Sequence, residues 1–180
     1  MCRFLAPAVA LALLASTVRA DNTGPTTEIA GLKSKVPATW KQQEAREPRV
    51  YHFILPKTGD EKYDAELMVF HFPGGGGGVK ANVDRWKGMV TPPEGKKIDD
   101  VTKVDEFKVG DVKVTTVDVA GTYLHKKTPM DATGEKRENY RLIGVVFEGA
   151  NDTYFMRLVG PAKTIEANKK GFDGWLKNFK

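Results

Sequence analysis

Five consecutive glycines at positions 74–78 precede a segment that carries Lys80 and Arg85. Glycine amides at the start of a helix, beside two cations, are groups that can bind a phosphate or a carboxylate. The candidate anion-binding residues are Gly76, Gly77, Gly78, Lys80 and Arg85. A phosphate-binding P-loop, however, has lysine directly after its last glycine, and here Val79 intervenes. The simpler interpretation is a flexible surface connection, and we expect the segment to bind no anion tightly.

Two histidines, His52 and His71, lie on neighbouring predicted strands that a short connection joins into a hairpin. If the strand register brought the rings together, two imidazoles with Asp64 or Glu66 could hold a metal ion. Their spacing matches no compact metal-binding signature, so the alternative is that each is an ordinary strand residue. We expect no cofactor.

A basic, polar segment forms a third candidate site, between two predicted strands. Its candidate partner-binding residues are His125, Lys126, Lys127, Met130, Lys136 and Arg137. A basic loop with one apolar side chain suits an acidic protein face or another anionic surface. The alternative is a solvated extension of a hairpin.

Residues for nucleophilic catalysis are scarce. Beyond residue 20, Ser34 is the only serine, and no Gly-x-Ser-x-Gly elbow surrounds it. The single cysteine is Cys2, so residues 21–180 contain no thiol for a disulfide, a metal site or a nucleophile. We therefore assign no catalytic residue.

The hydrophobic pattern predicts the elements that position these residues. Apolar runs typical of strands cover residues 29–36, 50–55, 65–72, 101–109, 112–123, 140–147 and 153–159. Apolar residues at helical spacing predict one helix over residues 79–89 and another over about 161–179. Residues 41–48 lack apolar periodicity and are expected to be a loop. The valines of residues 112–123 change phase, which predicts a β-bulge near Thr115 and Thr116.

The order of elements predicts the fold class. Most neighbouring strands are joined by connections too short for a parallel crossover, which favours a mainly antiparallel sheet. We predict an α+β fold in which two helices pack on one sheet, as an α/β/α sandwich, because residues 65–72 and 142–147 are apolar on both faces. One domain is expected over residues 29–180.

The amino terminus resembles a secretory signal. A short basic start is followed by an apolar run, and Val18-Arg19-Ala20 offers small residues for cleavage after Ala20. We expect residues 1–20 to be a signal peptide, residues 21–28 a loose leader, and the protein to be periplasmic or extracellular. No integral membrane segment is expected after removal of the signal.

The charge of the remaining chain excludes one class of partner. Residues 1–20 hold two of the 28 basic residues and none of the 23 acidic ones, so residues 21–180 carry a net charge of +3. That mild, mixed charge is unlike the dense basic face of a nucleic-acid-binding protein.

Four segments resemble a group of uncharacterised exported bacterial proteins: residues 36–40 (VPATW), 65–70 (AELMVF), the glycine run before 82–86 (NVDRW), and 154–161 (YFMRLVGP). The order of elements also resembles the PsbP-like fold. The resemblance covers nearly all of residues 21–180, and its motifs are structural rather than catalytic. It implies an accessory or binding role without enzymatic activity.

Two functional hypotheses follow. The first is an exported, non-enzymatic accessory or binding domain whose surface loops contact a protein or an anionic envelope component. The second is a small periplasmic hydrolase or ligand-processing enzyme that uses histidine or carboxylate groups. A deep pocket with convergent histidine or acidic side chains would favour the second.

Overall fold

The computed structural model describes residues 23–73, 75–126, 128, 131, 133–150 and 152–180. The elements are β1 (Thr26–Ile29), β2 (Leu32–Lys35), β3 (Lys41–Gln43), β4 (Arg49–Leu55), β5 (Ala65–His71), α1 (Val79–Lys87), β6 (Val90–Thr91), the 3₁₀ helix η1 (Ile98–Val101), β7 (Thr102–Val109), β8 (Val112–His125), β9 (Glu135–Glu148), β10 (Thr153–Pro161) and α2 (Ala162–Lys177). In the part of the chain that the structure describes, no helix is long and apolar enough to cross a membrane.

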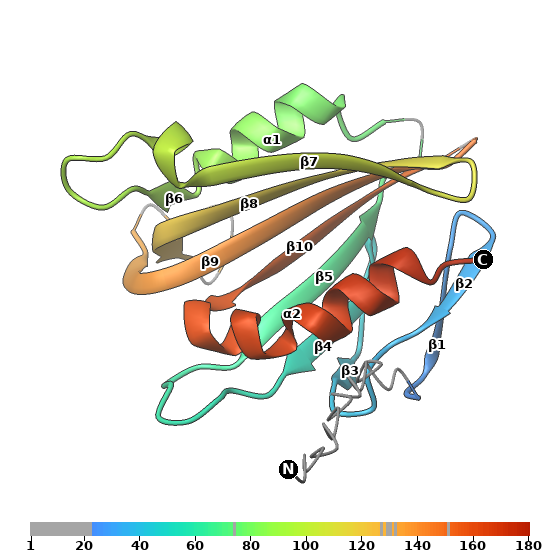
Figure 1. The fold of residues 1–180 in the computed structure, drawn as a ribbon, viewed down its shortest axis with the longest axis horizontal. Coiled ribbons are helices and arrows are strands. Elements are labelled where there is room, and N and C mark those ends of the chain that lie inside the picture. Colours follow the sequence, from blue (N-terminus) through green and yellow to red (C-terminus); the bar gives the residue numbers. More distant parts are fainter. Residues whose placement is uncertain (1–22, 74, 127, 129–130, 132, 151) are drawn as a thin grey trace, which may run out of the picture.

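One antiparallel sheet of eight strands forms the centre of the molecule (Figure 1). The strand order is β3-β4-β5-β10-β9-β8, and both β6 and β7 pair with the outer edge of β8. Strands β1 and β2 form a separate small hairpin. The predicted α+β class with a mainly antiparallel sheet is confirmed.

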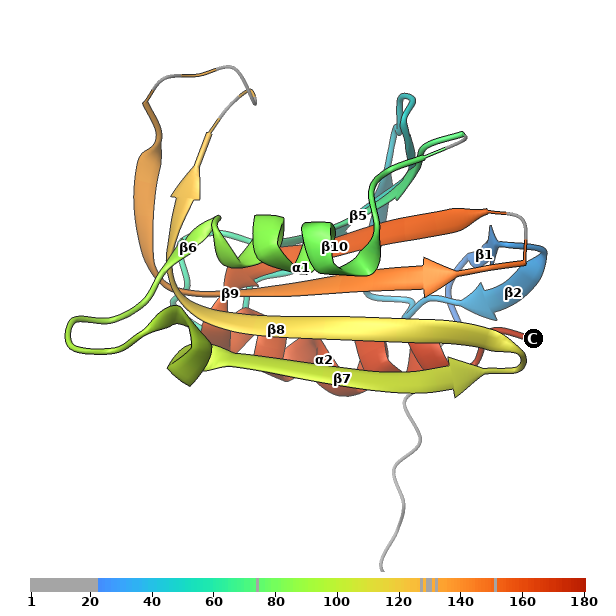
Figure 2. The same cartoon turned by 90° about the horizontal axis from the view of Figure 1, so that it is seen from above.

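The two helices pack on opposite faces of the sheet, with α1 in front of the strands and α2 behind them in Figure 2. Along β9, successive side chains alternate between the two faces and therefore between two separate cores. Ile143 and Val145 join the core under α2, whereas Leu142 and Val146 join the core under α1, which also contains Trp86. We call these the α2-side core and the α1-side core. Successive residues of a strand point to opposite faces, so a strand that is apolar throughout contributes to both cores.

The aromatic residues that the helical spacing singled out lie in these cores. Trp175 and Trp86 are 0% and 5% exposed. Trp40 is also buried, and its Nε1 donates a hydrogen bond of 3.1 Å to Oδ1 of Asn168 on α2. Helix α2 therefore holds together the sheet and the turn that carries Trp40.

The phase change of the valines in β8 has a different cause from the predicted bulge. The register with β9 runs without interruption from Lys113 to Gly121, and it shifts only between Gly121 and Tyr123. Val114 belongs to the α2-side core, whereas Val117 belongs to the α1-side core. The apolar face changes because the two helices cover different lengths of the strand, so the prediction of a bulge near Thr115 and Thr116 is wrong.

The amino-terminal part of the domain also differs from the prediction. Residues 29–36 are not one strand, since Ala30 and Gly31 make the turn between β1 and β2. Strand β1 begins at Thr26, inside the predicted leader, and Thr27 is fully buried. Its hydroxyl donates to the Ser34 carbonyl at 3.0 Å and accepts from Nε1 of Trp175 at 2.8 Å. The ordered domain therefore begins before residue 29.

Residues 41–48, predicted as a loop, contain the three-residue strand β3 at the edge of the sheet. All three residues of β3 are exposed. A short, exposed edge strand has no buried face, so it leaves no apolar periodicity in the sequence.

Candidate functional site

The α1-side face of the sheet carries a row of polar and sulfur-containing side chains beside helix α1. Trp86 of α1 lies over Gly144 of β9. Arg157 of β10 is the register partner of Gly144, Met68 of β5 is the next in line, and His52 of β4 follows. Register partners point to the same face of a sheet, so His52, Met68 and Arg157 form one row on the α1 side.

Arg157 is a half-buried cation with no carboxylate within ion-pair distance among the described residues. Its Nη1 lies 3.6 Å from Sδ of Met89, and its Nη2 lies 3.7 Å from Sδ of Met68. Its Nε is buried and has no hydrogen-bond partner in the described part of the chain. Thioethers are weak acceptors, so this guanidinium keeps most of its capacity to donate hydrogen bonds.

Arg49 and His52 extend the row at the outer strand. Nη1 of Arg49 lies 3.3 Å from Nδ1 of His52, and its guanidinium lies 5.8 Å from the ring centre of Phe70. On the other side, Nε2 of His52 lies 3.4 Å from Oε2 of Glu66 without the geometry of a hydrogen bond. Arginine is a donor only, so a neutral His52 accepts at Nδ1 and carries its proton on Nε2.

The surroundings of His52 favour this neutral form. Burial lowers the pKa of His52 below its ordinary value, and the charge of Arg49 lowers it further, while Glu66 acts in the opposite direction. At neutral pH the ring is therefore an uncharged donor at Nε2.

Three unsatisfied donors gather in this region. Four buried side-chain polar atoms of the described residues lack a hydrogen-bond partner, and three of them are Nε of Arg49, Nε2 of His52 and Nε of Arg157. Native proteins satisfy the large majority of such groups, so a concentration of them on one face needs an explanation. We call Arg49, His52, Glu66, Met68 and Arg157 the Arg157 cluster.

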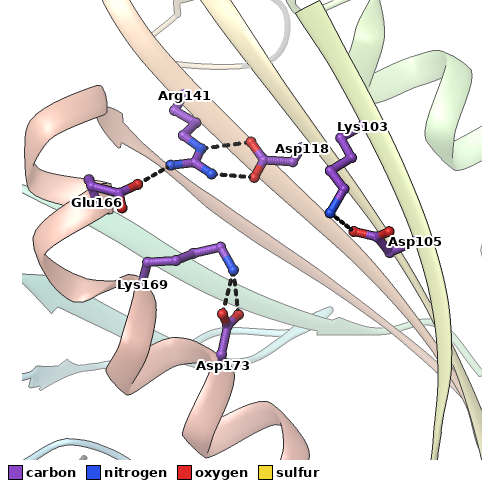
Figure 3. A network of polar contacts seen from close by, with 7 residues as sticks. All are labelled: Lys103, Asp105, Asp118, Arg141, Glu166, Lys169 and Asp173. Carbon is purple, nitrogen blue, oxygen red and sulfur yellow. Dashed lines mark hydrogen bonds and ion pairs between the residues drawn. The ribbon is translucent and has the colours of Figure 1, made fainter.

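A second charged region lies on the opposite face, beside α2 (Figure 3). Arg141 of β9 donates to both carboxylate oxygens of Asp118 at 2.7 and 2.6 Å, and to Glu166 of α2 at 2.6 Å. An open groove of about 600 Å³ is lined by these three residues among others. The hydrogen bonds that Arg141 donates to Asp118 and Glu166 raise the pKa of Arg141, although burial acts against them.

The three cations of the network beside this groove are all paired within the protein. Figure 3 shows three cations and four carboxylates, with Lys103 paired to Asp105 and Lys169 to Asp173. Each cation already has an acidic partner, and a bidentate arginine–carboxylate pair is among the strongest side-chain interactions. The contact between Arg141 and Glu166 joins α2 to the sheet, and these pairs lack the unpaired cation of the Arg157 cluster.

The glycine segment, the first predicted site, is organised by a residue that the prediction omitted. Nδ2 of Asn82 donates to the carbonyl oxygens of Gly76, Gly77 and Gly78 at 2.9, 3.3 and 3.1 Å, and Asn82 is only 2% exposed. Arg85 donates to Oδ1 of the same amide at 2.9 Å. The segment therefore begins α1 through an internal network, which explains its position without a ligand.

Lys80, the other cation of the predicted anion site, points to the exposed side of α1. Its Nζ pairs with Asp84 at 2.5 Å. Gly76 lies against the ring of Phe155, where a Cβ atom would come within 2.3 Å of the ring. Together with its φ of 140°, this close approach requires glycine at position 76.

The predicted metal-site histidines do not meet. His52 is the register partner of Met68 on the α1 side, whereas His71 is the partner of Tyr154, which packs against the α2-side core. His71 stacks on Tyr154 and contacts Asp152 at 3.0 Å. The two rings point to opposite faces, so the structure contradicts a shared site. No cluster of three or more potential metal ligands occurs among the described residues.

Of the predicted partner surface, Lys127 and Met130 lie outside the described residues. His125 ends β8, and Lys136 lies on β9, where it is the register partner of Leu124. Arg137 makes contacts within the protein. Its guanidinium lies 3.8 Å from the ring centre of Tyr63 and donates to Glu135 at 2.8 Å.

Sequence reasoning missed Arg157, although a signal was present. Residues 154–159 read YFMRLV, so a single charged residue interrupts a strand that is otherwise apolar on both faces. A charge in that position is costly unless it is paired or has a function.

Comparisons with known proteins do not identify a function. No protein-family model matches the chain, and no curated protein matches it. A search of solved structures finds similarity to a Pseudomonas aeruginosa protein of unknown function, PA94, described as a putative regulator. The TM-score is 0.48 and the identity 10%, over 86% of this chain and 94% of that one.

Proposed function

We propose that this protein is an exported, non-enzymatic binding domain that holds an anionic group of its partner against the Arg157 cluster. The observation that carries the proposal is the half-buried guanidinium of Arg157, whose side-chain hydrogen bonds within the described residues go only to two thioethers. A carboxylate or a phosphate would supply the acceptors that the protein does not, in the paired geometry that guanidinium favours. The partner is then a protein or an envelope component that bears such a group.

The surroundings of Arg157 favour an anion that has an apolar neighbour. Phe70 stacks with Phe72 at 6.2 Å between ring centres, and Phe72 is 37% exposed. Phe70 is the register partner of Arg49, and Met68 and Met89 flank Arg157. Methionine side chains adapt their shape to a ligand. An aromatic or aliphatic acid therefore fits this face better than a bare inorganic ion.

Export is the second part of the proposal, and it rests on the charge and apolar pattern of residues 1–20. The four sequence segments that resemble uncharacterised exported bacterial proteins support the same location and an accessory role. Protein recovered from the producing cells is expected to begin at Asp21, as measured by intact mass. A mature protein that retains Met1 would contradict export by this signal.

Binding is tested with soluble aromatic ions that differ in charge. We expect 2-naphthoate and 1-naphthyl phosphate to produce saturable shifts of the Nε–H signal of Arg157 and of the Met68 amide in NMR spectra, and a naphthylmethylammonium ion to produce none. Arg157→Gln should weaken anion binding about tenfold or more, since a hydrogen bond to a charged group contributes about 1.5–3 kcal/mol. The control, Arg46→Gln, removes an equal charge from an exposed arginine that pairs with Glu44, and it should leave the affinity unchanged.

A companion variant separates a binding role from a structural one. Arg157→Met replaces an unpaired cation by an apolar side chain of similar length, which is often neutral or stabilising in a buried site. We therefore expect an unchanged or higher midpoint of urea unfolding together with lost anion binding. A large loss of stability in Arg157→Met, or equal anion binding by wild type and Arg157→Gln, would overturn the proposal.

A further inference from the structure

The outer edge of β7 is a second surface without a partner. Strand β7 pairs with β8 along its whole length, from Thr102 to Val109. No other strand in the described part of the chain pairs with its outer edge, and it is an outermost strand in Figures 1 and 2. An edge of eight residues exposes a row of backbone donors and acceptors that another strand can use.

The side chains along this edge include an exposed valine. Val104 is 50% exposed, more than the other exposed large hydrophobic residues, Leu124 at 40% and Phe72 at 37%. On the opposite face of the strand, Lys103 and Asp105 form an ion pair at 2.7 Å. Charges usually protect an edge strand from pairing, so their order decides whether this edge can accept another β7.

In an antiparallel pairing of two identical strands, the two-fold axis passes beside one residue, and residues equally far from it oppose each other on the same face. With the axis at Val104, each valine opposes the other valine. Lys103 of each copy then opposes Asp105 of the other copy, on the α2-side face. Together with the ion pair inside each strand, these residues form a square of four charges in which every neighbour has the opposite sign.

Other axes along β7 are less favourable. An axis at Lys103, Asp105, Glu106 or Lys108 places that residue opposite its own copy, so that like charges meet. An axis at Phe107 opposes Glu106 to Lys108, but it leaves Val104 opposite the turn residue Gly110. The axis at Val104 alone covers the exposed valine and also opposes unlike charges.

We infer that β7 is a self-association edge, on which a second copy of this chain adds its own β7 antiparallel, with the two-fold axis at Val104. The two eight-stranded sheets then become one continuous sheet. Both α2 helices lie on the same side of it, and the two grooves lined by Lys103, Asp118 and Arg141 face each other across the axis. This interface is independent of the Arg157 cluster, which faces the α1 side.

The affinity of such a contact should be modest. Pairing from Thr102 to Glu106 involves five residues a side, fewer than the 20–30 a side of a standard stable interface. We therefore expect a reversible dimer whose population grows as the protein concentration rises over a range on the order of 10–1,000 µM. Sedimentation velocity of the purified protein over that range measures it.

Charge reversal tests the register. Lys103→Glu or Asp105→Lys places like charges opposite each other and should weaken dimerisation at least tenfold. The double variant Lys103→Glu/Asp105→Lys restores unlike charges, both across the axis and within each strand, so it should dimerise as wild type does. The control Lys41→Glu makes an equal charge change on β3, at the other edge of the sheet, and should dimerise normally.

Each result decides the matter. Rescue by the double variant supports the axis at Val104, and so does loss of the dimer in Val104→Asp with an unchanged melting temperature. A wild-type protein that is monomeric over the whole range overturns the inference. So does a double variant that remains monomeric, a loss in the Lys41 control equal to that in Lys103→Glu, or a dimer that responds only to Glu106→Lys and Lys108→Glu, as an axis at Phe107 requires.

Discussion

Replacing Trp175 with alanine is expected to lower the free energy of unfolding by about 3–5 kcal/mol. The indole is fully buried in the α2-side core. Its ring lies 5.3 Å from that of Phe179 and 6.1 Å from that of Trp40, between ring centres. Alanine would lose these contacts and leave a cavity that the neighbouring rings cannot close.

Trp175 also fixes the amino-terminal hairpin to α2, through its side chain and its backbone carbonyl. Nε1 of Trp175 donates to the hydroxyl of Thr27 at 2.8 Å, and the carbonyl oxygen of Trp175 accepts from Ser34 at 2.7 Å. The Trp175→Ala variant removes the first of these bonds and leaves the buried Thr27 hydroxyl without its donor. The hydroxyl still donates to the Ser34 carbonyl, so the lost bond adds about 0.5–1.5 kcal/mol to the effect of the cavity.

Equilibrium unfolding in urea, followed by far-ultraviolet circular dichroism, measures the loss. A domain of this kind has a total stability of about 5–15 kcal/mol, so Trp175→Ala should shift the midpoint severely or leave the protein partly unfolded. Trp175→Phe is the matched control, because it keeps an aromatic ring and removes the hydrogen bond. Its loss should be clearly smaller, and equal midpoints for Trp175→Ala and wild type would contradict the position of Trp175 in the core.

The helices and most of the strands could be predicted because their signals are local. In α2, Phe172, Trp175 and Leu176 recur at the spacing of one helical face, and all three are buried. Hairpin turns such as that at Gly110, where φ is +58°, are likewise marked by glycine. These features depend on residues that are close in the sequence, so the sequence pattern is sufficient to locate them.

The features that were missed depend on register and on which helix covers which part of a strand. The separation of His52 from His71 follows from their pairing with Met68 and Tyr154, and this pairing cannot be derived from the spacing of the histidines. The valines of β8 change face because α1 and α2 cover different lengths of it. A one-residue difference in register exchanges the two faces of a strand, so local patterns leave such questions open.

The candidate sites include one feature that is conspicuous in the sequence and one that is not. The glycines before α1 are conspicuous in the sequence, but their role depends on Asn82, whose side chain reaches back to three of their carbonyl groups. Arg157 is inconspicuous in composition, since the chain has 28 basic residues. Its importance lies in the absence of an ion-pair partner among the described residues, which depends on the three-dimensional arrangement of side chains far apart in the sequence.

The contact between Trp86 and Gly144 is the basis of the second large effect. Trp86 is 5% exposed and lies directly on β9, where a Cβ atom at position 144 would come within 2.1 Å of the indole ring. Trp86→Ala should therefore cost about 3–5 kcal/mol of stability through the cavity that it leaves. Gly144→Ala should cost about 1–3 kcal/mol, because the added methyl group forces α1 away from the sheet.

The double variant provides the stricter test, because the two substitutions act on the same contact. Without the indole, the methyl group of Ala at position 144 meets no ring and fills part of the cavity. The loss of stability in Trp86→Ala/Gly144→Ala should therefore be smaller than the sum of the two single losses, by about 0.5–3 kcal/mol. Gly75→Ala serves as the control, since a Cβ atom there meets nothing within 4 Å, and its effect should be within about 0.5 kcal/mol.

The Gly144→Ala variant also tests whether the position of α1 affects the Arg157 cluster. Met89, three residues after Trp86, contacts Nη1 of Arg157, so a displaced α1 moves one of the two thioethers that flank the guanidinium. Gly144→Ala should therefore shift the NMR signal of the Arg157 Nε–H, whereas Gly75→Ala should not. Additive losses in the double variant, measured by urea unfolding, would show that α1 does not rest on β9 through this contact, and an unshifted Arg157 signal would show that the Arg157 cluster is independent of α1.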